Sequence, residues 1–218
     1  MSLDFHFILR SLPLFGSGLV ITVELSLLAI FFAMVWGLVV AFGRMSFRRL
    51  PRGLAGAYIE LVRDTPVLVQ MYFIYFGFSM AGFGLTGFES ALLALSLQNG
   101  GYVAEIYRAG IESISAKQIE GGKALGMSRW DVMSIVVLPQ ALVRVIPPLA
   151  NQFIVIIKDT SLVSAIAVAD LTQIGKLLTE RTAASYEVFL TIAVFYLVMT
   201  GIVSALSRLA ERQFAIYH

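Results

Sequence analysis

Residues 115–140, SAKQIEGGKALGMSRWDVMSIVVLPQ, are the longest run between the apolar segments that can form ordered helix while carrying charge. The opening serine and Gln118 fit a capping box, in which the hydroxyl accepts an early helix N–H and the amide side chain reaches back. Gly126 suits the left-handed residue that closes a helix. Ser128, with an aspartate three residues later, repeats the start signal. The stretch therefore predicts a helix, a tight turn and a second short helix between two apolar spans.

Several residues of this stretch stand at fixed distances from Glu120. Glu120, Gly121 and Gly122 are followed by Gly126 and, after nine further residues, by VVLP at 136–139. This spacing resembles the EAA loop of ATP-binding-cassette (ABC) importer permeases, whose pattern is Glu-Ala-Ala, three residues, Gly, nine residues and Ile-x-Leu-Pro. Here glycine replaces both alanines and valine replaces the isoleucine. Each glycine loosens a helix by about 1 kcal/mol relative to alanine.

The flanking sequence extends the resemblance over nearly the whole chain. RDTPVLVQMYFIYFG (63–77), YVAEIYRAGIESI (102–114) and KDTSLVS (158–164) are similar to the polar-amino-acid branch of that family, which includes permeases of the glutamate, aspartate, glutamine and histidine type. The resemblance implies an all-α, type I ABC importer (MetI-like) transmembrane domain with cytoplasmic coupling helices. The alternative for the stretch itself is an ordinary amphipathic loop helix.

The composition is that of a polytopic membrane protein. Hydrophobic residues make up 58% of the chain and charged residues 14%, whereas soluble domains have roughly 45–50% and 25%. The chain has no cysteine, and its two histidines stand at opposite ends. Disulfides, thiolate metal sites and cysteine nucleophiles are excluded, and we expect this chain to bind no metal or cofactor. The net charge of +2 gives no reason to expect a nucleic-acid partner.

Five segments are predicted to cross the membrane, since a span needs about 20 apolar residues. They are residues 17–43, 66–83, 88–104, 132–157 and 188–209. The third is the weakest, because Glu89, Gln98 and Asn99 interrupt it. Four arginines within residues 44–52 follow the first span, against a lone Arg10 before it, so the positive-inside rule places the N-terminus outside. The loop at 115–131 and the C-terminus then face the cytoplasm.

Two further segments complete the predicted organisation. Residues 1–15 mix apolar and polar positions and are interpreted as an interfacial helix or an irregular arm. Residues 162–168, LVSAIAV, are too short to cross and are predicted to form a re-entrant or half-buried piece packed against other helices. The whole chain, residues 1–218, is predicted to be one transmembrane permease domain. It is expected in the bacterial cytoplasmic (inner) membrane as a multi-pass protein surrounded by lipid.

The predicted coupling site lies in the loop. In the family, this helix sits in a cleft of the ATP-binding subunit with the glutamate and glycine at its centre, and the resemblance carries these roles to Glu120 and Gly126. The site that we expect to contact that subunit comprises Glu120, Gly121, Gly122, Ala124, Leu125, Gly126 and Met127. Apolar residues here, with Ile119 and Trp130, are unusual on a bare aqueous loop. The alternative is that they fold back onto the bundle or into the headgroup layer.

Two candidate regions could line a substrate pathway. Lys158, Asp159, Thr160 and Ser161 follow a span that contains two prolines, and polar groups at a helix break suit a midplane substrate site. Lys158 could meet a carboxylate and Asp159 an ammonium; the alternative is an interfacial pair that fixes a turn. Asn99 and Tyr102 flank a pair of glycines in the third span. Their alternative is hydrogen bonding to a neighbouring helix, which is the commoner use of an amide in such surroundings.

The leading functional hypothesis is the permease subunit of an ATP-driven importer for polar amino acids, without enzymatic activity of its own. No G-x-x-x-x-G-K-[ST] motif occurs in the chain, so ATP and Mg would be bound by a separate ABC ATP-binding subunit. The resemblance also implies a second permease chain, identical or paralogous, and an extracytoplasmic solute-binding protein. The alternatives are a stand-alone secondary transporter or channel for small polar solutes and, last, a membrane enzyme. No nucleophile–base pair or carboxylate dyad supports the enzyme.

Overall fold

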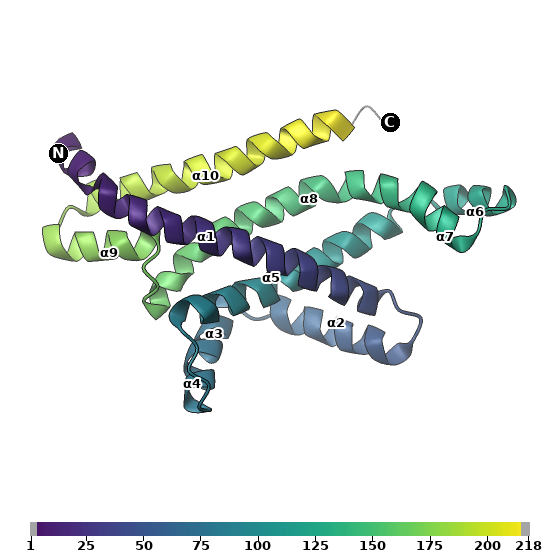
Figure 1. Ribbon diagram of the computed structural model, residues 1–218, viewed down its shortest axis with the longest axis horizontal. Coiled ribbons are helices and arrows are strands. Elements are labelled where there is room, and N and C mark those ends of the chain that lie inside the picture. Colours follow the sequence, from purple (N-terminus) through teal and green to yellow (C-terminus); the bar gives the residue numbers. More distant parts are fainter. Residues whose placement is uncertain (1–3, 215–218) are drawn as a thin grey trace.

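The computed structural model describes residues 4–214, and over that range the fold is all-helical, as predicted (Figure 1). The helices are α1 (Phe5–Arg44), α2 (Arg49–Arg63), α3 (Val67–Tyr72), η1 (a π-helix, Phe73–Gly77), α4 (Phe78–Met80), α5 (Gly87–Glu112), α6 (Ala116–Ala124), α7 (Arg129–Asp131), η2 (a π-helix, Val132–Val137), α8 (Leu138–Asp159), η3 (a 3₁₀-helix, Thr160–Ile166), α9 (Leu171–Thr182) and α10 (Ser185–Phe214).

Three helical segments are long and apolar enough to cross a membrane: Phe5–Arg44, Arg129–Ile166 and Ser185–Gln213. The predicted first, fourth and fifth spans lie within them. The predicted second span coincides with a shorter apolar helical segment, Val67–Met80, and the third lies within α5. The count of five spans and the orientation of the chain therefore remain predictions.

The N-terminal region differs from the prediction, because residues 5–15 are the first turns of α1. Asp4 caps this helix by accepting a hydrogen bond from the Phe7 N–H at 3.0 Å. Phe15 is fully buried with Leu171 and Val188. A helix of 40 residues is about 60 Å long at 1.5 Å per residue, twice the hydrocarbon thickness. Helix α1 alone therefore reaches the end of the bundle where α9 and α10 meet, and residues 5–15 form no separate arm.

The region after α8 contains more helix than predicted. The helix passes through Pro147 and Pro148 without a break, so the irregularity expected there is wrong. The short apolar piece forms η3, in which Val163 and Ile166 are buried, and its predicted packing against other helices is confirmed. Helix α9, which follows, was not predicted.

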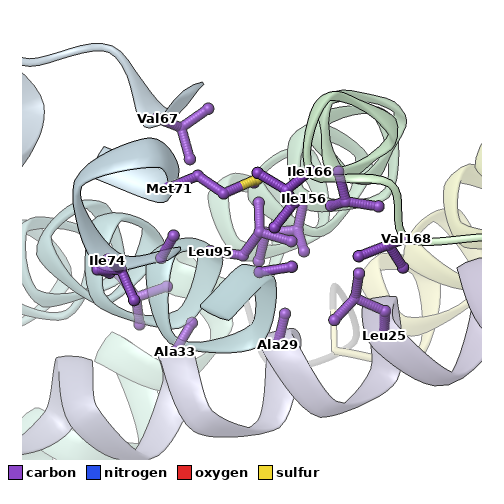
Figure 2. Packing of buried hydrophobic residues seen from close by; sticks show 14 of the residues in the cluster. Leu25, Ala29, Ala33, Val67, Met71, Ile74, Leu95, Ile156, Ile166 and Val168 are labelled. Atoms are coloured by element: carbon purple, nitrogen blue, oxygen red, sulfur yellow. The ribbon is translucent and has the colours of Figure 1, made fainter. Parts of the chain in front are cut away.

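The main core lies where α1, α3, α5 and α8 meet (Figure 2). Small residues let α1 and α5 approach closely. A Cβ added at Gly37 would lie 2.7 Å from Val103 Cγ1, and one at Gly100 would lie 2.7 Å from Trp36 Cδ1. Small residues at such crossings are typical of helix packing in membranes. The two glycines between Asn99 and Tyr102 thus face neighbouring helices, Gly100 at α1 and Gly101 at α2.

The basic segments gather at one end of the molecule. The turn from α1 to α2, the α6–α7 loop and the C-terminal turns of α10 lie at the same end, whereas α9 and the first turn of α1 lie at the other (Figure 1). This arrangement is the one that the predicted topology requires. The C-terminus itself and His218 lie outside the described residues.

Candidate functional site

The loop between α5 and η2 projects from the end of the bundle (Figure 1). Its first helix, α6, closes with Gly126 at φ +81°, the left-handed conformation that was predicted. The Met127 N–H donates to the Gly122 carbonyl at 3.1 Å, and the Gly126 N–H donates to the Lys123 carbonyl at 3.0 Å. These two bonds form a Schellman motif, which satisfies the last carbonyls of the helix. The turn is therefore rigid and fixes the direction of the next helix.

The two predicted helix starts have different outcomes. Ser128 and Asp131 form the predicted reciprocal cap: the Asp131 N–H donates to Ser128 Oγ, and the Ser128 N–H donates to Asp131 Oδ2, both at 3.2 Å. Ser115 occupies the N-cap position of α6, but its side chain makes no capping bond, so the capping box with Gln118 is wrong. The first turn of α6 is solvent-exposed, and water can satisfy N–H groups at such a helix end.

The apolar side chains of the loop divide between two directions. Ile119 and Met127 are half-buried and pack against the cluster of Ile114, Val132 and Val137. Leu125 and Trp130 point outward and are 85% and 74% exposed. The inward pair supports the loop from the bundle, as the alternative interpretation expected. The outward pair leaves apolar surface for a partner.

The backbone at the predicted coupling residues is unevenly accessible. Gly122 is buried, and a Cβ at this position would lie 3.1 Å from Val132 Cγ2, whereas Gly121 faces open space. Glu120 is exposed, and within residues 4–214 its carboxylate makes no hydrogen bond or ion pair. The structure thus places a free carboxylate, an exposed glycine and exposed apolar side chains on one projecting element.

A second feature is a cleft of about 480 Å³ between α5 and α8, to which Arg63 of α2 also contributes. It is lined by Arg63, Tyr102, Glu105, Ile106, Ala109, Gly110, Ser113, Arg144, Pro148 and Gln152. The Arg63 guanidinium carbon lies 5.1 Å from the centre of the Tyr102 ring. Gln152 Nε2 donates to Asn99 Oδ1 at 2.6 Å, and Asn99 Nδ2 donates to the Leu95 carbonyl at 2.8 Å. Of the sequence-predicted residues, Tyr102 lines the cleft, and the buried Asn99 supports it through Gln152.

The second predicted pathway region lies elsewhere. Lys158, Asp159, Thr160 and Ser161 do not line this cleft. Thr160 is fully buried, and its hydroxyl donates to the Ile157 carbonyl at 2.6 Å. The ion pairs within residues 4–214 are those of Arg108, so Lys158 and Asp159 are not paired there. The structure does not bring these four residues together with Tyr102.

Several residues of the cleft were not predicted as site residues. Gln152 is the clearest, because a polar side chain within a predicted membrane span is itself a signal of a polar site. Arg63, Glu105 and Arg144 come from three helices, so no local pattern joins them. Within residues 4–214, no three His, Asp or Glu side chains come together as metal ligands would.

Known proteins resemble the chain over nearly all of its length. The profile of the family described as "Binding-protein-dependent transport system inner membrane component" matches residues 33–215. The glutamine transport system permease protein GlnP of Escherichia coli is 38% identical, with 99% of this chain and 100% of that protein covered. The nopaline transport system permease protein NocM of Agrobacterium fabrum is 35% identical, with 96% and 91% covered.

Solved structures agree with this likeness. The crystal structure of an amino acid ABC transporter with histidines includes a chain that is 38% identical and superposes with a TM-score of 0.92, with 98% of this chain and 100% of that chain covered. A chain of the MetNI methionine ABC transporter, in an inward-facing conformation, superposes with a TM-score of 0.78 over 94% of this chain and 98% of its own. At 19% identity, the second match shows the fold alone.

Proposed function

Because the chain belongs to the family of binding-protein-dependent transport system inner membrane components, we propose that it is the permease subunit of an ABC importer that moves polar amino acids. The family is a transport component and not an enzyme. Such a system implies an ATP-binding subunit and a solute-binding protein as partners. The proposed location is the bacterial cytoplasmic membrane, with several spans.

The observation that carries this proposal is the projecting loop. Leu125 and Trp130 are exposed on this helix–turn–helix, which is closed at Gly126 and capped at Ser128. On the same loop, the Glu120 carboxylate has no partner within residues 4–214. Exposed apolar surface rimmed by polar groups marks a site of contact with a protein or a membrane, and we propose a protein here. The proposed occupant is the ATP-binding subunit, which holds ATP and Mg. Glu120, Gly121, Gly122 and the residues 124–127 form the proposed contact.

The proposed substrate pathway passes through the cleft between α5 and α8. Arg63 and Arg144 can meet the carboxylate of an amino acid, whereas Glu105 and the Tyr102 ring can meet its ammonium. Asn99 acts here as a support, since it positions Gln152. A pathway role for residues 158–161 is a separate proposal, because they lie outside this cleft.

Two such chains, identical or paralogous, are proposed to enclose the pathway. The cleft is open on a single chain, and its charged side chains stand on helices that would otherwise face lipid, which is costly for charge. In the proposed cycle, ATP binding draws the two ATP-binding subunits together and carries the coupling loops with them. The spans shift from inward-open to outward-open, and hydrolysis releases them.

Uptake into proteoliposomes tests this proposal. The chain, its co-purifying ATP-binding subunit and the solute-binding protein are reconstituted with ATP inside. Uptake of radiolabelled glutamine, glutamate, aspartate and histidine is measured one at a time, with a non-hydrolysable ATP analogue as the control. We expect ATP-dependent uptake of at least one of them, and a lower rate for Gln152→Leu. Uptake that is independent of ATP, driven by an ion gradient alone, would favour the secondary transporter.

A further inference from the structure

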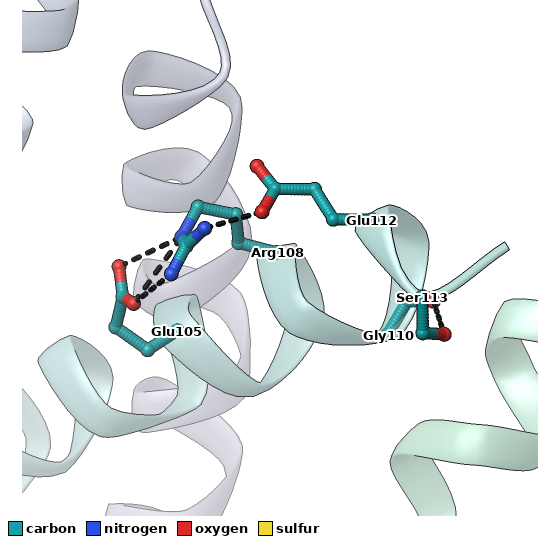
Figure 3. Close-up of polar contacts among 5 residues, drawn as sticks. All are labelled: Glu105, Arg108, Gly110, Glu112 and Ser113. Atoms are coloured by element: carbon teal, nitrogen blue, oxygen red, sulfur yellow. Dashed lines mark hydrogen bonds and ion pairs between the residues drawn. The ribbon is translucent and has the colours of Figure 1, made fainter. Parts of the chain in front are cut away.

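The last turns of α5 connect the cleft to the coupling loop. Glu105 lines the cleft, and Glu112 stands just before the loop. Arg108 lies between them and pairs with both: its Nη2 is 2.6 Å from Glu105 Oε2, and its Nη1 bonds Glu112 (Figure 3). One guanidinium therefore links two carboxylates that are seven residues apart. Pairs at these spacings stabilise the helical form of the segment that they span.

The same turns of α5 are joined to α8. Gly110 of α5 allows the two helices to touch, because a Cβ at this position would overlap Val145 Cγ1. One turn further along, Arg144 of α8 donates from Nη1 to the Ser113 carbonyl at 2.5 Å. Ser113 is the C-cap residue of α5, two residues before the N-cap of α6. Arg144 thus contacts the root of the loop and also lines the cleft.

From this geometry we infer that Arg144 is a positioning residue for transport, which fastens the coupling loop to the wall of the cleft. The Ser113 carbonyl is its acceptor, and the packing of α5 on α8 at Gly110 is the adjoining contact. When the partner subunit moves the loop, the fastened pair of helices moves as one body and changes the cleft. Without Arg144, movement of the loop no longer changes the shape of the cleft. This inference rests on the proposed function, since coupling has a meaning only in an ATP-driven complex.

The test compares transport with ATP hydrolysis in the same proteoliposomes. Wild type, Arg144→Met and Arg144→Lys are reconstituted with the ATP-binding subunit and the solute-binding protein. Uptake uses the fastest substrate among glutamine, glutamate, aspartate and histidine at saturating concentration. We expect Arg144→Met to keep its ATPase activity but to transport several-fold fewer molecules per ATP. Arg144→Lys keeps a cationic donor, and we expect it to restore much of the wild-type number of molecules transported per ATP. Arg181→Met, an exposed arginine in α9, is the matched control and keeps the wild-type ratio.

The outcomes separate the inference from the proposed function. If the wild type shows no ATP-dependent uptake, the proposed function fails first. If the wild type transports and Arg144→Met has the wild-type ratio, the inference alone is wrong. A change in KM with the ratio preserved would leave Arg144 with its contact to substrate alone, without a role in coupling, and would also overturn the inference. If Arg144→Met does not assemble, Arg144→Gln replaces it, with the same two outcomes.

Discussion

Gly126 shapes the loop between α6 and α7 through its backbone alone. A Cβ at this position would meet nothing within 4 Å, so space is not the constraint. The constraint is the φ of +81°, where L-residues other than glycine, asparagine and aspartate are disfavoured by roughly 1–2 kcal/mol. The turn that sets the direction of α7 and the position of Trp130 therefore depends on this one residue.

Two substitutions separate backbone strain from the presence of a side chain at Gly126. Asparagine tolerates the left-handed region, whereas valine is β-branched and does not. We expect Gly126→Asn to keep most of the uptake, and Gly126→Val to lose it several-fold with normal membrane insertion. Uptake in cells, normalised to the amount of chain in the membrane, measures this. Equal uptake by both variants would show that the left-handed turn is not needed.

Residue patterns predicted the local features of the site but not its long-range pairs. The turn at Gly126 and the cap at Ser128 depend on residues within three or four positions, and both were found. Asn99 bonds Gln152, which is 53 positions away, and only the packing of α5 on α8 brings the two together. The missing cap at Ser115 shows that a local pattern can also mislead. The pattern permits a capping hydrogen bond, but a helix end that is exposed to water does not require one.

At the scale of the elements, the contact of α5 with α8 fixes both the cleft and the root of the loop. Gly110 lies directly against Val145, with Ala141 beside it, so two small residues set the distance between the helices. The sequence shows glycines in this helix but not which neighbour they face. The same limit explains why α2 was not predicted. Its buried residues are Gly56, Ile59 and Val62. This buried face is short, and the arginines that precede it in the sequence do not suggest a packed helix.

A double substitution tests this helix contact. Gly110→Ala forces a methyl group into Val145, and overpacking of this kind costs about 1–3 kcal/mol. We expect a lower thermal unfolding midpoint in detergent for Gly110→Ala, and partial recovery when Val145→Ala is added. Gly16→Ala is the control, because nothing lies within 4 Å of its added Cβ. Additive losses in the double variant would mean that the two positions do not touch.

For the whole molecule, the charges and the spans agree on one arrangement. The basic segments share an end in Figure 1, with the projecting loop among them. Apolar length identified the three strongest spans, because each is a continuous run within one helix. It could not identify α5 as securely, since polar residues such as Asn99 and Gln98 are buried in this helix by its neighbours. Burial between helices is a property of the assembled bundle and not of a segment.

The absence of cysteine from the sequence makes the orientation easy to measure. Single cysteines are placed at Lys123, in the loop, and at Ser185, at the opposite end; both positions are exposed. We expect a membrane-impermeant maleimide to label Ser185→Cys in intact cells. Lys123→Cys should be labelled only after the membrane is permeabilised. Labelling in the reverse order would invert the predicted topology and remove the loop from the reach of a cytoplasmic subunit.

The central claim is that the projecting loop binds an ATP-binding subunit. The most direct measurement is purification of the tagged chain from its native membrane, followed by identification of the proteins that accompany it and an ATPase assay. We predict that an ATP-binding subunit co-purifies with the wild type and with Glu180→Trp, an exposed position in α9. It should be lost or uncoupled in Glu120→Trp and Gly126→Val, although both variants still insert in the membrane. A chain that purifies alone, without ATPase activity and without dependence on the loop, would contradict the claim.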